Sequence, residues 1–254
     1  MNHPLGGSTA YSGDAPGGNP ELSIVIPVYN ERENILSLWE ELRASLATAG
    51  RSFEVLFVDD GSDDGSAEAL ATVRRSAREV RVLRLARNTG QTAALLAGFD
   101  ASRGLIVVTM DADRQNNPDD IPSLIEKIPE FDAAVGFRKN RRDSWVRLVS
   151  SRIANSVRNS LSGDDIIDTG CTLKAFRREC LKSIPAFNGM HRFFPTLVRM
   201  GGFRVCQVPV SHRPRVAGRS KYGIGNRALR SFHDLLAVRW MKRRHIRYRV
   251  TEEA

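Results

Sequence analysis

The stretch GLIVVTMDADRQNN, residues 104–117, places a short apolar run directly before two aspartates that are separated by one residue. The run at 104–110 predicts a buried strand, because it is short, rich in β-branched residues and followed by turn-forming residues. Asp111 and Asp113 have two interpretations. Aspartate is common in turns that end strands, whereas two carboxylates this close together can both bind one hard divalent cation.

The run at 104–110 is the fourth strand in a regular alternation of strand and helix patterns. The order βαβαβαβ is typical of a parallel sheet with helices on its faces. The predicted strands are 22–28, 53–58, 80–85 and 104–110, and the helices between them are 33–49, 67–77 and 91–102. Further strands are predicted at 133–137, 171–176 and 204–210, and further helices at 145–161 and 192–200. We therefore predict an α/β fold with a mostly parallel sheet.

Composition divides the 254 residues into one domain and two tails. Residues 1–20 are dense in Gly, Pro and Ser, so we expect a disordered leader. Residues 21–225 form the predicted α/β domain, which ends in a loop at 210–226 rich in Gly, Pro and basic residues. Residues 226–254 predict a basic amphipathic helix. The sequence has no apolar run of 18 residues and no signal-peptide pattern, which favours a cytosolic protein.

The three cysteines, Cys171, Cys180 and Cys206, show no CxxC spacing and cannot all be paired. We expect them to be buried reduced thiols, not a zinc site or a disulfide framework. The fingerprints of P-loop and dinucleotide-binding proteins are absent, and the histidines lack metal-ligand spacing. We therefore do not expect a P-loop protein, a dinucleotide-binding protein or a zinc protein.

The net charge of +9 is divided unequally along the chain. Residues 1–127 contain 12 Lys and Arg against 19 Asp and Glu, whereas residues 128–254 contain 26 against 10. A change of this size indicates that the second half meets phosphate groups of nucleic acid, an anionic membrane or a phosphorylated substrate.

Polar, largely acidic clusters follow three of the predicted strands. They are Tyr29-Asn30-Glu31, Asp59-Asp60-Gly61-Ser62 and Asp111-Ala112-Asp113. Ligands of open α/β sheets bind beyond the carboxyl ends of the strands, because loops converge there and helix N-termini point outward. The three clusters are therefore expected to face one edge of the sheet, which favours the metal interpretation of Asp111 and Asp113.

These motifs resemble the successive signatures of family-2 glycosyltransferases. They are SIVIPVYNE at 23–31, FVDDGSDDG at 57–65, RNTG at 87–90 and DADRQNNP at 111–118. The resemblance implies the GT-A fold, a Rossmann-like, mostly parallel sheet with helices on both faces. Later motifs resemble the polyprenyl-phosphate glycosyltransferases, the group that contains dolichyl-phosphate mannose synthase. They are GFR at 136–138, Arg147-x-x-x-Ser151, DTGCTLKAFRR at 168–178 and RVAGRSKY at 215–222.

The resemblance implies a role for each matching residue. Around the donor nucleotide it places Pro27, Tyr29, Glu31, Val58, Asp60, Asp111 and Ala112. At a Mg²⁺ or Mn²⁺ ion it places Asp111, Asp113 and Gln115. Around the donor diphosphate and the acceptor phosphate it places Arg138, Arg147, Ser151, Arg215 and Lys221. With Asp113, these last residues are the expected catalytic group.

The implied reaction moves a sugar from a nucleotide-sugar donor to a polyprenyl phosphate, with inversion at the anomeric carbon. We expect the protein to be cytoplasmic and peripherally associated with the inner face of the membrane, through the basic C-terminal helix or a small membrane partner protein. One departure from the family stands out. Arg114 occupies a position where relatives usually have an apolar or small residue, and neither the chemistry nor the resemblance explains it.

Two alternatives have distinct requirements. A family-2 enzyme with a saccharide acceptor would need a carboxylate base, and the second half offers no obvious one, with Asp168 alone left open. A nucleic-acid-binding protein would use the basic half, but the chain is only 7% aromatic and has no zinc-finger or RNA-binding signature. An acid-lined sheet edge would also repel a phosphate backbone. We therefore expect no nucleic acid among the partners.

Overall fold

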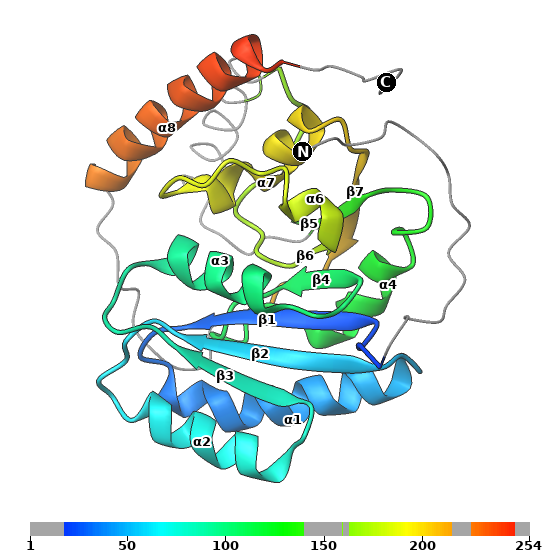
Figure 1. Ribbon diagram of the computed structural model, residues 1–254, viewed down its shortest axis with the longest axis vertical. Helices are drawn as coiled ribbons and strands as arrows, with labels where there is room; N and C mark the ends of the chain where they lie inside the picture. Colours follow the sequence, from blue (N-terminus) through cyan, green and yellow to red (C-terminus); the bar gives the residue numbers. More distant parts are fainter. Residues whose placement is uncertain (1–17, 140–158, 160–162, 215–224, 247–254) are drawn as a thin grey trace, which may run out of the picture.

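The computed structural model describes residues 18–139, 159, 163–214 and 225–246, with side chains described from 231 onward in the last range (Figure 1). Within these residues, seven strands form one sheet in the order β3-β2-β1-β4-β6-β5-β7. The strands are β1 (Leu22–Val28), β2 (Phe53–Asp59), β3 (Val80–Arg84), β4 (Ile106–Thr109), β5 (Ala133–Arg138), β6 (Lys174–Arg177) and β7 (Val205–Val210).

The sheet is parallel except at one strand. β1 pairs in parallel with both β2 and β4, and β2 pairs in parallel with β3. β6 runs antiparallel to its neighbours β4 and β5, whereas β5 and β7 are parallel. Six strands therefore run in one direction and β6 alone runs in the other, so the prediction of a mostly parallel α/β sheet is confirmed.

The helices cover both faces of the sheet (Figure 1). They are α1 (Arg32–Thr48), α2 (Ser66–Ser76), α3 (Gln91–Ala101), α4 (Ile121–Ile125), α6 (Arg178–Leu181), α7 (Phe194–Met200) and α8 (Gly225–Arg244). A 3₁₀ turn at Met190–Phe193 precedes α7, so this helix begins later than the predicted 192–200. The predicted helix at 145–161, apart from residue 159, and most of the predicted leader lie outside the described residues.

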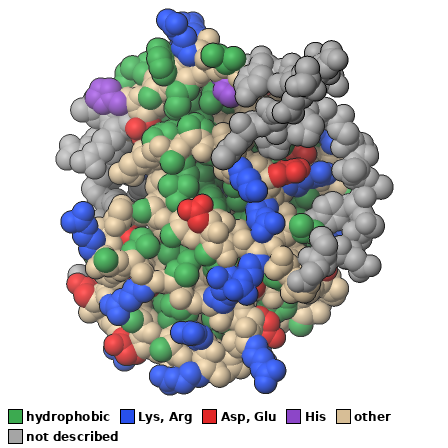
Figure 2. Space-filling view, in the orientation of Figure 1, with side chains coloured by type: hydrophobic (Ala, Val, Ile, Leu, Met, Phe, Trp, Pro, Cys, Tyr) green, Lys and Arg blue, Asp and Glu red, His purple; other side chains and the backbone are tan. Residues whose placement is uncertain are grey.

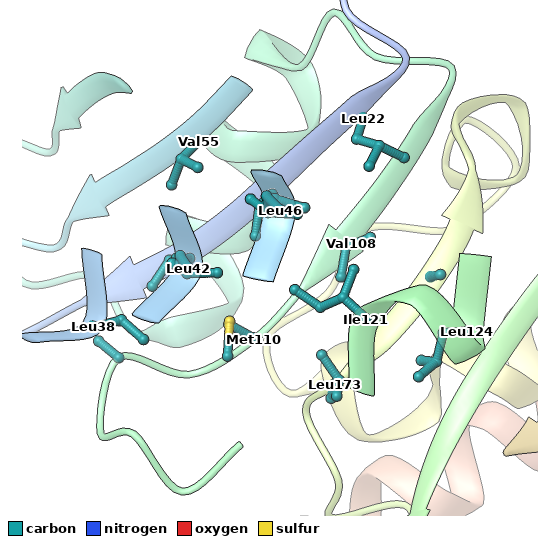
Figure 3. Packing of buried hydrophobic residues seen from close by; sticks show 14 of the residues in the cluster. Leu22, Leu38, Leu42, Leu46, Val55, Val108, Met110, Ile121, Leu124 and Leu173 are labelled. Atoms are coloured by element: carbon teal, nitrogen blue, oxygen red, sulfur yellow. The ribbon is translucent and has the colours of Figure 1, made fainter. Parts of the chain in front are cut away.

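The alternating side chains of β1 divide the core into two layers. Leu22, Ile24 and Ile26 pack in a cluster with α1, α2 and α4, whereas Val25 packs in a second cluster with α3, α7 and α8. Figure 3 shows the first cluster, where leucines of α1 meet side chains of the sheet and of α4. Because β1 is buried on both faces, its sequence is almost continuously apolar.

The cysteines agree with the sequence-based expectation of free thiols. All three are free, with Cys171 and Cys180 buried and Cys206 half-buried. Burial raises the pKa of each thiol, since a thiolate would lose its hydration. In the part of the chain that the structure describes, no helix has the length and apolar character needed to cross a bilayer.

Gly98 marks the closest approach of α3 to the sheet. A Cβ at this position would lie 2.2 Å from Val25 Cγ1 and 3.3 Å from Val58 Cγ2. An alanine would gain about 1 kcal/mol of helix propensity, but overpacking of a buried site costs about 1–3 kcal/mol. The steric cost is expected to exceed the gain.

We therefore expect Gly98→Ala to lower the free energy of unfolding by about 1–2 kcal/mol, measured by denaturant titration. Val25→Ala removes the methyl group that a Cβ at 98 would strike. The double variant Val25→Ala/Gly98→Ala should thus lose less stability than the sum of the two single changes. Additive losses would contradict the proposed steric origin.

Candidate active site

The carboxyl ends of β1, β2 and β4 lie at one edge of the sheet. In the parallel register Val28 is opposite Asp59, and Thr109 is opposite Val25. The three polar clusters predicted from the sequence follow these strand ends and are therefore brought to the same edge. Asp59 and Asp60 are almost fully buried, and so is Asp113.

The loops after β1 and β2 are tied together by side-chain hydrogen bonds. Asn30, whose φ is 53°, donates from its backbone N–H to Ser62 Oγ at 3.0 Å and from Nδ2 to Asp63 Oδ1 at 2.7 Å. Glu31 donates from its backbone N–H to Ser66 Oγ at 2.9 Å. These bonds fix the position of Glu31, which directly precedes α1.

Asp60 orients the loop that leads into α3. Its Oδ1 accepts from the backbone N–H of Thr89 at 2.7 Å, and its Oδ2 accepts from that of Gly90 at 2.8 Å. α3 begins at Gln91, so the carboxylate also lies at a helix N-terminus, where negative charge is favoured. Gly61 adjoins the same loop with φ 72°, and a Cβ there would lie 2.7 Å from the backbone of Arg87.

Asp111 and Asp113 lie in a turn, and their two carboxylates are separated by one residue. Asp111 Oδ1 accepts from Gln91 Nε2 at 2.8 Å, so α3 orients the first aspartate. Asp113 Oδ1 accepts from the backbone N–H of Gln115 at 3.2 Å, which is the hydrogen bond of an Asx turn. Asn116 Oδ1 accepts from the backbone N–H of Asp111 at 3.2 Å.

The oxygen ligands of this loop suit a metal ion whose remaining ligands come from the substrate. Among residues 18–139, 159, 163–214 and 225–246 there is no group of three or more His, Cys, Asp or Glu side chains that could bind a metal. Mg²⁺ is commonly bound by one or two carboxylates together with water and substrate phosphates. Asp111, Asp113 and the amide of Gln115 are oxygen donors of this kind, so the residues suit Mg²⁺ or Mn²⁺ and do not suit zinc.

The two aliphatic residues Val58 and Ala112 among the predicted nucleotide contacts have buried side chains. Val58 is fully buried in the core cluster on the α3 side, and Ala112 is 3% exposed in the other cluster. Pro27 lies opposite Val58 in the sheet register. The predicted contacts of Val58 and Ala112 with a nucleotide would therefore have to use backbone atoms.

Arg138 lies at the end of β5 and is paired with Asp168. Its Nε donates to Asp168 Oδ2 at 2.6 Å and its Nη2 donates to Oδ1 at 2.9 Å. Asp168 Oδ1 also accepts from the backbone N–H of Gly170 at 3.0 Å. The buried Asp168 carboxylate thus orients the guanidinium of Arg138. The other predicted phosphate-binding residues, Arg147, Ser151, Arg215 and Lys221, lie outside the described residues.

A cavity of about 190 Å³ lies beside Asp111. It is lined by polar groups that sequence reasoning missed, among them Gln91, Thr172, Lys174 and His191. Lys174 is 3% exposed, burial lowers the pKa of its ammonium group, and it donates a hydrogen bond to the carbonyl oxygen of Cys171. A lysine between the apolar residues Leu173 and Ala175 of a predicted strand was the available signal, whereas no spacing pattern marks Thr172 or His191.

Comparison with known proteins agrees with the fold and with the family resemblance. Residues 23–184 match the model of glycosyl transferase family 2. A dodecaprenyl-phosphate galacturonate synthase of Rhizobium johnstonii is 39% identical over 229 residues, which cover 88% of this chain and 68% of that protein. An undecaprenyl-phosphate 4-deoxy-4-formamido-L-arabinose transferase of Pseudomonas paraeruginosa is 41% identical over 217 residues, which cover 85% of this chain and 64% of that protein.

Solved structures show the same fold at lower sequence identity. Glucosyl-3-phosphoglycerate synthase of Mycobacterium tuberculosis, in complex with Mn²⁺, UDP-glucose and phosphoglyceric acid, has a TM-score of 0.68 and 21% identity. The match covers 87% of this chain and 80% of that one. The predicted GT-A fold and the resemblance to polyprenyl-phosphate transferases are thereby confirmed. The chain is a glycosyltransferase and belongs to glycosyl transferase family 2.

Proposed function

We propose that this protein transfers a sugar from a nucleotide-sugar donor to a polyprenyl phosphate, with inversion at the anomeric carbon. The main support is the pair of oriented carboxylates, Asp111 and Asp113, at the sheet edge beside a polar cavity. The acceptor class is supported by the two relatives described above, both named as acting on polyprenyl phosphates. The excess of Lys and Arg after residue 127 is suited to an anionic acceptor.

The donor would bind at the acidic edge. Asp111, Asp113 and Gln115 would hold Mg²⁺ or Mn²⁺, which when bound neutralises charge on the departing diphosphate. Gln91 keeps Asp111 in place through its amide, and Asp60 keeps the loop before α3 in place through two backbone N–H groups. Tyr29 and Glu31 follow β1 at the same edge and would contact the nucleoside.

The acceptor would need little help from a base. A phosphate monoester has its second pKa near 6 and is therefore an anionic nucleophile at neutral pH. Positioning and electrostatic stabilisation would supply most of the rate, and the planar guanidinium of arginine can bind two phosphate oxygens at once. Arg138, Arg147, Ser151, Arg215 and Lys221 are the proposed contacts with the two phosphate groups.

A saccharide acceptor fits the described site less well. A sugar hydroxyl needs a carboxylate to remove its proton. Asp168, the candidate base, accepts two hydrogen bonds from the guanidinium of Arg138 and one from the backbone of Gly170. These bonds favour a role in holding Arg138 in place over proton transfer.

The proposed reaction is tested by incubating the protein with Mn²⁺, labelled nucleotide sugars and polyprenyl phosphate. We expect one label to enter the lipid phase and a chelator to abolish the transfer. Asp113→Asn should lower kcat by about 100-fold or more, because a metal Lewis acid stabilises the transition state by several kcal/mol. Asp119→Asn is the matched control, since Asp119 is a nearby exposed aspartate.

Three outcomes would contradict the proposal. Full wild-type activity in the presence of a chelator would show that the reaction needs no divalent metal. Transfer of label to a saccharide in place of the lipid would favour the other acceptor class. A sugar trapped as an ester on a carboxylate would exclude direct inversion.

We further propose that α8 contacts an anionic membrane surface at the cytoplasmic face. The helix has two apolar stripes. Leu235 and Val238 are buried against the core, whereas the side chains of Phe232, Leu236 and Trp240 recur every fourth residue and are 46%, 42% and 63% exposed. Hydrophobic and basic side chains lie side by side at the top of the molecule, where α8 lies (Figure 2).

Basic residues accompany the exposed stripe. On a helical wheel with 100° per residue, Arg239 and Arg243 lie on the same side as the exposed stripe. An apolar stripe flanked by arginines is typical of helices that lie in the interface of anionic bilayers.

We expect the protein to bind anionic phospholipid vesicles and to be released by high salt, measured by vesicle sedimentation. Trp240→Ser should weaken binding by about tenfold or more, because burying a tryptophan removes about 150–250 Å² from water. Leu36→Ser is the matched control, as Leu36 is 51% exposed on α1. If Trp240→Ser binds the vesicles as well as the wild type does, the membrane contact lies on another surface or on a partner protein.

A further inference from the structure

Arg114, the residue that departs from the family pattern, has an unusual backbone conformation. Its φ is 61°, and Asn30 is the other non-glycine residue with positive φ among those described. The left-handed region is unfavourable for residues that have a Cβ, and asparagine enters it more easily than arginine does. Interactions elsewhere must therefore hold Arg114 in this conformation.

The side chain of Arg114 is bound to Glu41 of α1. Its Nε donates to Glu41 Oε1 at 3.1 Å, and its Nη2 donates to the same oxygen. The two side chains are 21% and 26% exposed, so the pair is partly withdrawn from water. Withdrawal from water reduces dielectric screening and so strengthens the Coulomb attraction between the two groups.

A second arginine reaches the same carboxylate from the opposite end of the chain. Arg213, which follows β7, donates from Nη1 to Glu41 Oε2 at 2.7 Å. Its Nη2 donates to Asn117 Oδ1, and its backbone N–H donates to the carbonyl oxygen of Gln115 at 3.0 Å. Both oxygens of Glu41 are thus used, one by each arginine.

We propose that Glu41, Arg114 and Arg213 are positioning residues for the divalent metal. This role rests on the proposed function. The three residues would fix the loop 111–117 so that Asp111 and Asp113 can bind the same ion. Arg114 fixes the loop by its side chain, and Arg213 fixes it at Gln115 and Asn117. Glu41 joins the two arginines to the rigid helix α1.

Charge adds to this geometric role. The Glu41 carboxylate compensates two guanidinium groups that belong to, or contact, the proposed metal-binding loop. Without that carboxylate, two uncompensated positive charges would lie near a site for a dication and would repel it. Removal of Glu41 should therefore weaken metal binding both by freeing the loop and by raising the local positive potential.

The test measures Mn²⁺ binding directly by electron paramagnetic resonance, in the presence of UDP or GDP, whichever supports binding to the wild type. We expect Glu41→Gln to weaken the apparent affinity for Mn²⁺ by about 10–100-fold, the usual effect of losing a residue that orients metal ligands. Glu40→Gln is the matched control and should bind Mn²⁺ like the wild type. Glu40 is the preceding residue of α1 and pairs with Arg43 at 2.9 Å on an exposed surface.

Arg114 supplies a second, independent pair of variants. Arg114→Gly removes the ion pair but accepts the left-handed conformation, whereas Arg114→Ala removes the ion pair and keeps a Cβ. We expect the loss of positioning to outweigh the loss of one positive charge near the ion, so both variants should weaken Mn²⁺ binding, and the alanine variant should weaken it more. The two Arg114 variants test the positioning role if Glu41→Gln does not fold.

The outcomes separate this inference from the proposed function. If Glu41→Gln and both Arg114 variants bind Mn²⁺ as tightly as the wild type, with only a lower Tm, the three residues brace the fold and the positioning role is wrong. If the wild type binds no Mn²⁺ with either nucleotide, the metal role in the proposed function fails as well. A 10–100-fold loss confined to Glu41→Gln and the Arg114 variants, with Glu40→Gln unaffected, supports the inference.

Discussion

Parallel pairing of β1 with both β2 and β4 is the constraint on which the site depends. Three strands that run in one direction deliver the residues after Val28, Asp59 and Thr109 to one edge, although these residues are far apart in the sequence. The pairing in turn requires β1 to be apolar on both faces, because helices cover it on each side. The hydrogen bonds between the loops after β1 and β2, and those of Asp60 and Asp111 with residues at the start of α3, form only because the strand ends are adjacent.

The acidic edge combines structural and chemical demands. A buried carboxylate is costly unless it is hydrogen-bonded or paired. Asp60 meets this demand through two backbone N–H groups and Asp113 through that of Gln115, and the half-buried Asp111 accepts from the amide of Gln91. The same bonds orient the oxygens, so the stability of the loops and the geometry of the proposed metal site come from one set of contacts. A turn and the proposed metal-ligand pair at residues 111–113 are therefore compatible, because one conformation would serve both.

Local patterns predicted the fold better than they predicted the details of the site. β1 matches its predicted range, and the other strands before β5 differ from prediction only at their ends, since buried runs and helical periodicity are local properties of the sequence. The antiparallel direction of β6 and the sheet order β4-β6-β5-β7 depend on long-range pairing, which no local pattern encodes. Likewise, Lys174 and His191 line the cavity beside Asp111 through tertiary packing alone. The pairing of Arg138 with Asp168 across 30 residues was equally invisible in the motifs.

The ion pair between Glu41 and Arg213 joins residues that are 172 positions apart. In a chain made from its N-terminus, the sequence DADRQNN is complete long before the residue that fixes Gln115 and Asn117 has been added. Closing a chain loop of this length also costs conformational entropy, which must be offset before the contact is stable. The loop can therefore reach its final shape only after Arg213 has been added, so a shorter nascent chain presents both aspartates without the contacts on which the proposed metal site depends.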